Sequence, residues 1–385
     1  MYLPVLLIRD FGWWSFAAFA IPNCLGAAGF GWAVLTEARS RSLMLMHAPA
    51  IRAFALVTVA FQVCFLAWMI THTGAGVAVG AGLLVGGLAG AFAGARAAPT
   101  GMGSAMAPRA GPVAGAYVLS LACVVAYAAS HPSSAATDWP TDVPGLAWLA
   151  PVCALGFALC PFLDPTFHQA CQGAWRAGGP GASRRAFSLG FLVLFPLMIG
   201  FTLLYAPALL AGATRGQLGT SPPSLAPPIV AFHMALQAAV TAALHLPHAR
   251  RAASPAVPRT RDSNLIAALV LVALAVLAAF ASARTFEVTY RLFMSFYALV
   301  FPAYVWICMA PTFRAPEAPG RRRLFAFACA VVVAAPFLGL GFLRGEHWAL
   351  GPGVLVVLLA RLAAGRGEHA ARVPSACVPL PKPLD

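Results

Sequence analysis

One stretch of residues that can carry chemistry interrupts an apolar part of the chain, "CPFLDPTFHQACQ" from Cys160 to Gln172. Asp164 and His168 are four residues apart, so on a helix they would lie on the same face. An aspartate at the centre of a membrane costs about 2.5–3.5 kcal/mol on insertion scales, so it requires a partner or a purpose. With an imidazole beside it, such a carboxylate could bind a proton or a cation.

The same stretch predicts a broken helix. Pro161 has no N–H and should disrupt the arriving helix, whereas Asp164 followed by Pro165 is typical of the cap and first residue of a new one. Two interpretations are open. Either the break forms a polar site inside the membrane, with Thr166 and Gln169 contributing, or Asp164 only caps a helix at the membrane surface.

A second set of polar residues recurs every four positions in "FHMALQAAVTAALHLPH", and its members are His233, Gln237, Thr241 and His245. Side chains at this spacing form one stripe along a helix. In lipid the stripe should face the bundle interior, either lining an aqueous path or making hydrogen bonds between helices. Asn23, beside Pro22 in another apolar run, has the same two possible roles.

The elements that must position these residues are predicted to be membrane helices. The chain is 61% hydrophobic and only 9% charged, with a mean hydropathy of +0.81, which places it in the membrane class. A span needs roughly 20 apolar residues. About eleven such runs are present, near 12–36, 51–71, 74–95, 112–130, 145–163, 186–210, 226–246, 264–282, 288–312, 324–343 and 347–364. We predict an all-α bundle forming one domain over 1–365, and a disordered tail over 366–385.

Basic residues predict the orientation of this bundle. The net charge of +14 does not indicate nucleic acid, because the basic residues occupy short segments between apolar runs. Alternate segments hold 20 and 5 of the 25 basic residues, and the richer set should face the cytoplasm. The C-terminus is then cytoplasmic and, for an odd number of spans, the N-terminus lies outside. The expected location is the cytoplasmic membrane of a bacterium, with membrane lipid as a partner.

Common catalytic sequence motifs are absent from the sequence. It contains no GxSxG, HExxH, Walker A or DxD pattern, and its nine cysteines form no CxxC pair. We therefore expect neither an enzyme nor a metal site or disulfide framework, and no cofactor apart from a possible coupling Na⁺ or H⁺. Glu287 and Arg291, four residues apart, should form an ion pair.

The segment "LGFALCPFLDPTFHQACQ" resembles the broken sixth core helix of LeuT-type secondary transporters, particularly the sodium:solute symporters. The resemblance implies an inverted-repeat bundle that moves a small solute by alternating access. It makes the span near 12–36 the second core helix, so that the first would precede Met1. In the family a hydroxyl pair on the eighth core helix helps to bind sodium. Only Thr241 is available here, so a proton on Asp164 and His168 is at least as plausible as sodium.

Two other classes of function remain open at this point. One is a non-transporting scaffold or sensor that retains a transporter fold. The other is a membrane-embedded transferase, in which Asp138 and Asp142 of the loop "DWPTDVPG" would face an active site outside the membrane. The sequence leaves the solute and the oligomeric state open.

Overall fold

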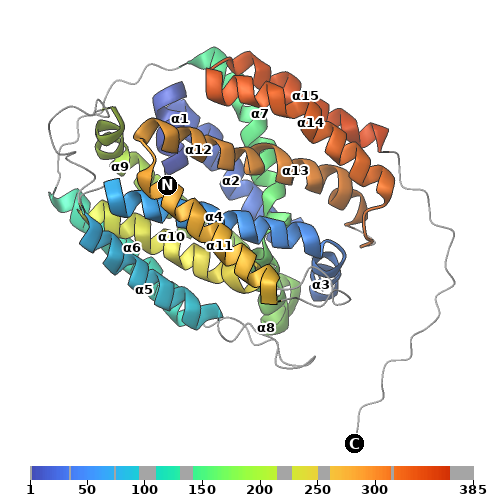
Figure 1. Ribbon diagram of the computed structural model, residues 1–385. Helices are drawn as coiled ribbons and strands as arrows, with labels where there is room; N and C mark the ends of the chain where they lie inside the picture. Colours follow the sequence, from blue (N-terminus) through green and yellow to red (C-terminus); the bar gives the residue numbers. More distant parts are fainter. Residues whose placement is uncertain are drawn as a thin grey trace, which may run out of the picture.

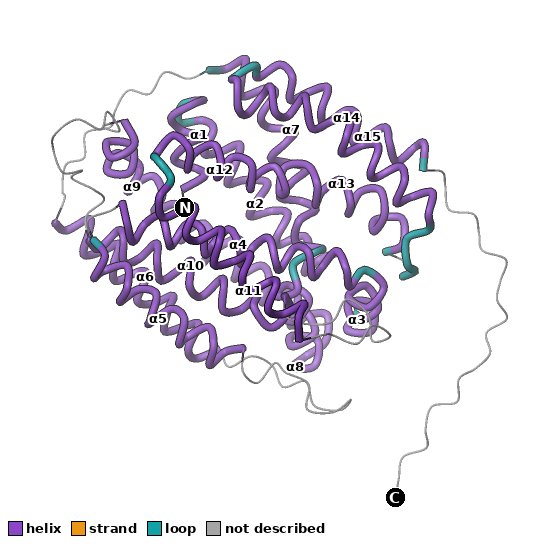
Figure 2. Tube along the Cα trace, in the orientation of Figure 1, coloured by secondary structure: helices purple, strands orange, loops and turns teal. Residues whose placement is uncertain are grey.

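A computed structural model describes residues 2–33, 36–72, 75–94, 110–130, 142–214, 228–249, 261–313 and 316–364. These residues are almost entirely helical, and none of them forms a strand (Figures 1 and 2). The predicted all-α bundle is therefore confirmed. The predicted disordered tail, 366–385, lies outside the described residues.

The described residues form fifteen α-helices. Their bounds are α1 (Tyr2–Phe11), α2 (Trp14–Ala33), α3 (Glu37–Met46), α4 (Ala48–His72), α5 (Gly76–Gly94), α6 (Ala110–Ser130), α7 (Val143–Leu159), α8 (Pro165–Leu189), α9 (Phe195–Thr214), α10 (Pro228–Ala249), α11 (Arg261–Phe280), α12 (Ala283–Ser295), α13 (Phe301–Tyr304), α14 (Arg321–Arg344) and α15 (Leu350–Ala363). A π-helical turn joins α8 to α9, and another joins α12 to α13.

Many of these helices are suited to a membrane. Within the described residues, seven are long and apolar enough to cross one, or eight if the bent pair α2–α3 counts as a single span. Three shorter apolar helices, Gly76–Phe92, Leu269–Phe280 and His347–Ala363, lie in three further runs predicted as spans. The long apolar helices agree with an integral membrane protein. Their number, seven or eight, is smaller than the eleven spans predicted from the sequence.

Helix packing divides much of the bundle into two groups. In the first, α10 lies along α5 and α4, and α11 packs on α4; in the second, α2 packs against α7 and α8. The hairpin α14–α15 packs beside α7 at the edge of the bundle (Figure 1). The cavity described below is lined by helices of both groups.

Glycines bring the backbones of each group close together. A Cβ added to Gly82 or Gly86 of α5 would lie 2.4 Å from the carbonyl oxygen of Phe232 or Leu236 on α10. In the other group, a Cβ on Gly26 of α2 would lie 2.4 Å from the carbonyl oxygen of Phe157 on α7. Small residues allow this kind of approach between membrane helices, so each group is tightly packed within itself.

Alanine at Gly86 should therefore destabilise the protein, by about 1–3 kcal/mol, because the new methyl group meets a backbone carbonyl that cannot move aside independently. Gly87 is a matched control on the same helix, since an added Cβ there has no atom within 4 Å. Gly87→Ala should be neutral or slightly stabilising, because alanine is the better helix former. Thermal unfolding in detergent measures both; equal melting temperatures for the two variants would contradict this packing.

Candidate functional site

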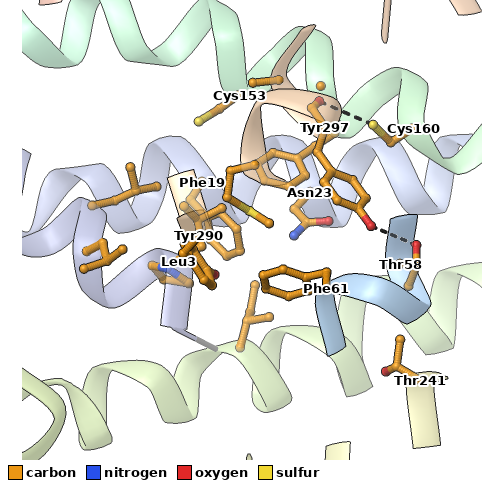
Figure 3. A pocket seen from close by; sticks show the side chains of 18 of the residues that line it. Leu3, Phe19, Asn23, Thr58, Phe61, Cys153, Cys160, Thr241, Tyr290 and Tyr297 are labelled. Atoms are coloured by element: carbon orange, nitrogen blue, oxygen red, sulfur yellow. Dashed lines mark hydrogen bonds between the residues drawn. The ribbon is translucent and has the colours of Figure 1, made fainter. Parts of the chain in front are cut away.

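A cavity of about 500 Å³ lies between the two helix groups. Helices α2 and α7 line it from one group and α4 and α10 from the other, with α1, α9 and α12 completing the wall. Its lining is mostly aliphatic and aromatic. Figure 3 shows Asn23 and Thr58 among these apolar side chains, with Thr241 nearby. A largely apolar cavity with a few convergent polar groups is the usual form of a small-molecule site.

The predicted helix break is confirmed at one end of this cavity. Helix α7 ends at Leu159, a short 3₁₀ turn follows over Cys160–Phe162, and α8 begins at Pro165. The Oδ1 atom of Asp164 accepts hydrogen bonds from the backbone N–H of Thr166, at 2.8 Å, and from its hydroxyl, at 2.7 Å. Asp164 is thus the N-cap of α8, and it also lines the cavity. The capping role of Asp164 is confirmed, and its place in the cavity lining makes it a candidate site residue.

The partner of Asp164 is His245 on α10. The two side chains are 15% and 6% exposed, and His245 Nε2 lies 3.3 Å from Asp164 Oδ1. On the opposite side of the ring, His245 Nδ1 donates to the carbonyl oxygen of Thr241 at 2.9 Å. Because that carbonyl can only accept, Nε2 carries a hydrogen only when the ring is protonated. At 3.3 Å the two atoms are within ion-pair distance, although Nε2 makes no hydrogen bond of ordinary geometry within the described residues. The contact is attractive only when one proton is present, on the imidazole or on the carboxyl group.

The predicted pairing of Asp164 with His168 is wrong. The His168 ring is fully buried, and its Nε2 donates to the carbonyl oxygen of Phe162 at 2.9 Å while Nδ1 lies 2.9 Å from the Ser40 hydroxyl. The Ser40 hydroxyl also accepts from Gln172 at 3.0 Å. Asp164 turns back to cap α8 instead of following the helix face, so the i, i+4 geometry does not apply. His168 instead joins α8 to α3.

Three further predicted site residues are Asn23 on α2 and Thr166 and Gln169 on α8. Asn23 lines the cavity. Thr166 holds the Asp164 carboxylate through its hydroxyl. Gln169 is half-buried on α8 and does not belong to the cavity lining.

The polar stripe of α10 also serves two purposes. Gln237, Thr241 and His245 line the cavity. His233 lies outside this lining and makes a hydrogen bond between helices, with its Nδ1 3.0 Å from the hydroxyl of Tyr205 on α9. The four-residue recurrence was the sequence signal for His245, but it did not show that Asp164 is its partner.

At the other end of the cavity, four charged residues form an ionic network: Arg9 and Asp10 of α1, and Glu287 and Arg291 of α12. Arg9 donates to both carboxylate oxygens of Glu287, at 2.7 and 2.9 Å, and to Asp10 at 2.8 Å. Arg291 contacts Asp10 and Glu287 and donates to the Phe342 carbonyl oxygen of α14 at 2.8 Å. The predicted pair Glu287–Arg291 is thus half of a network that joins three helices.

The connection between α1 and α7 shows how the two charged sites are arranged. The backbone N–H of Asp142, which precedes α7, donates to the carbonyl oxygen of Phe11 at 3.3 Å, so α7 starts beside the end of α1. Asp164 follows the far end of α7, and a helix of 17 residues is about 25 Å long. Asp10 and Asp164 both line the cavity, which therefore extends between the ionic network and the Asp164–His245 pair.

Comparison with protein-family models, curated proteins and solved structures finds no match to this chain. Within the described residues, no three His, Cys, Asp or Glu side chains are grouped so that they could hold a metal ion.

Glu287→Gln should lower the melting temperature in detergent. The substitution removes the charge that faces both Arg9 and Arg291, whose side chains are only 24% and 17% exposed, and a hydrogen bond to a charged group is worth about 1.5–3 kcal/mol. Glu317→Gln is the control, because Glu317 pairs with Arg323 while 54% exposed, and such ion pairs contribute little. Equal losses in the two variants would show that the network adds nothing specific.

Proposed function

We propose that this chain is a secondary transporter that carries a small solute through the cavity by alternating access, and that it couples this movement to a proton on the Asp164–His245 pair. One observation carries the proposal. A pair of side chains that needs one proton lines a cavity of solute size, with one partner on each helix group.

The arrangement of the two helix groups supports alternating access. Each group is packed tightly through glycine contacts, so a relative movement of the groups alters the cavity between them more readily than it alters either interior. Polar contacts lie at both ends of the cavity, the ionic network at one and the Asp164–His245 pair at the other. Charged contacts of this kind can separate when water enters, which makes both ends suitable for opening in turn.

The resemblance to LeuT-type transporters is part of the same proposal. Sites in secondary transporters commonly lie where a membrane helix is discontinuous, and here the α7–α8 discontinuity lines the cavity. A proton is favoured over sodium as the coupling ion because Thr241 is the only hydroxyl in the polar stripe of α10, and because the Asp164–His245 contact is attractive only when a proton is present. In a bacterial cytoplasmic membrane, the distribution of basic residues would place the C-terminus inside.

A transferase has less support than a transporter. Asp138 lies outside the described residues. Asp142 caps α7 by accepting from the Gly145 N–H at 3.0 Å, and its other carboxylate oxygen lies 2.9 Å from His347 Nδ1. A structural role, capping α7 and binding His347, is enough to explain these contacts of Asp142. A non-transporting scaffold or sensor would explain the helix groups but leaves the proton-requiring pair in the cavity without a purpose.

The test is uptake by proteoliposomes with an imposed pH gradient, using a panel of radiolabelled neutral and charged small solutes. For a solute that is taken up, Asp164→Asn should reduce gradient-driven uptake by at least about tenfold, because one ionisable partner contributes roughly that much or more when its proton is essential. Asn remains a good N-cap, so α8 should still form.

Asp142→Asn is the matched control, since it also changes a helix-capping aspartate with a histidine partner but lies outside the cavity lining. It should leave uptake unchanged. Unaltered coupled uptake in Asp164→Asn would overturn the role of the pair, and no uptake of any solute by the wild-type chain would favour the scaffold or sensor.

A further inference from the structure

Resting on the transport function proposed above, we infer that the solute is a monovalent organic cation with an apolar or aromatic body, and that this cation and the proton on the Asp164–His245 pair exclude one another. The inference follows from the charges that line the cavity, from the free oxygen of Asp164 and from the aromatic rings between the two charged sites.

Among the described residues that line the cavity, no positive group is free for an anionic solute. Among its lining residues, Asp10, Asp164, Arg291 and His245 can carry a charge near neutral pH. The guanidinium of Arg291 is occupied by Asp10, by Glu287 and by the Phe342 carbonyl oxygen. A helix start can bind an anion through its N–H groups, but at the start of α8 the Thr166 N–H already donates to Asp164. A carboxylate or phosphate solute would therefore find no available partner at either end.

Asp164 offers an acceptor for a cation. Its Oδ1 atom receives both hydrogen bonds from Thr166 and faces His245. Its Oδ2 atom has no hydrogen-bond partner among the described residues, although Asp164 lines the cavity. A charged donor on a carboxylate makes one of the stronger hydrogen bonds in proteins, so Oδ2 suits an ammonium group.

Aromatic rings line the same cavity as this acceptor. Phe19, Phe61, Tyr290 and Tyr297 come from three different parts of the chain and surround Asn23 in Figure 3. The ring centroids of Phe61 and Tyr290 are 5.1 Å apart. The faces of Phe and Tyr rings attract cations within about 6 Å. Such rings, with the aliphatic side chains of the lining, favour an apolar body attached to a positive charge.

A balance of charge makes the cation and the proton compete. With its proton the pair has no net charge, whether written as carboxylate with imidazolium or as carboxyl with imidazole. When a monovalent cation binds the Asp164 carboxylate, the proton leaves His245 Nε2 for solvent and the neutral ring remains bonded to Thr241. One positive charge enters and one leaves, so the site keeps its net charge. Cation and proton would then move across the membrane in opposite directions.

Phenyltrimethylammonium is a suitable probe because it is permanently charged, so any effect of pH belongs to the protein. Binding to the purified full chain in detergent is measured by titration calorimetry in buffers of different ionisation enthalpy, which reports protons released. We expect about one proton released per cation bound, and an affinity that falls by up to about tenfold per pH unit on the acid side, as linkage between two competing ligands requires.

Two further aromatic probes, one neutral and one anionic, distinguish the effect of the solute's charge from that of its shape. tert-Butylbenzene, the uncharged isostere, should bind the wild-type chain and Asp164→Asn equally. Benzoate should not bind measurably. Phenyltrimethylammonium should bind Asp164→Asn at least about tenfold more weakly than the wild type, and should bind Asp142→Asn as tightly as the wild type.

His245→Gln gives a second variant that keeps the carboxylate. It should still bind the cation, but with a much smaller proton release between pH 6 and 8. Cation binding that is unaffected by Asp164→Asn, binding without proton release, or tighter binding of benzoate would each overturn the inference. If gradient-driven uptake is found for a solute that phenyltrimethylammonium does not inhibit, the transport function holds and the solute class is wrong. If the cation binds but no solute is transported, the transport function is wrong.

Discussion

The contact between Asp164 and His245 is the interaction on which the functional arrangement depends. A single carboxylate oxygen, Oδ1, caps the start of α8 and meets a ring carried by α10. The first role fixes where the chain interrupts its helix, and the second fixes how that interruption faces the other helix group. Because both roles use one oxygen, the protonation of the pair and the geometry of the break are physically linked.

Charged groups are rare in this chain, and two sets of charged or ionisable groups line the cavity in the described residues, each with partners of opposite sign. Removing one member of a buried pair leaves an uncompensated charge, which is much more costly than the pair itself. The ionic network contains two arginines and two carboxylates, and Asp164 lies within ion-pair distance of His245. A cavity with compensated groups at its two ends can remain largely apolar along its length. That property suits a solute whose charge is confined to one end of its body.

The sequence predicted what depends on neighbouring residues and missed what depends on distant ones. Pro161 and the Asp164–Pro165 pair predicted the broken helix because caps and proline act locally. The stripe on α10 predicted a polar face for the same reason, through helical spacing. The partner of Asp164 could not be predicted, since His245 is distant in sequence and the extended backbone of a cap removes the i, i+4 relation with His168. The contact of Arg9 with Glu287 joins residues 278 positions apart, and no periodicity indicates it.

The glycine contacts between α5 and α10 have a consequence for His245. Backbones held this closely leave α10 little room to move relative to α5, so the position of the imidazole is tied to the α5–α10 pair. Asp164 belongs to the other group, so the 3.3 Å separation of the two side chains depends on how far apart the two groups lie. Under the proposed function, a proton on the pair would hold the two groups together, and its loss would leave an oxygen and a nitrogen lone pair facing each other.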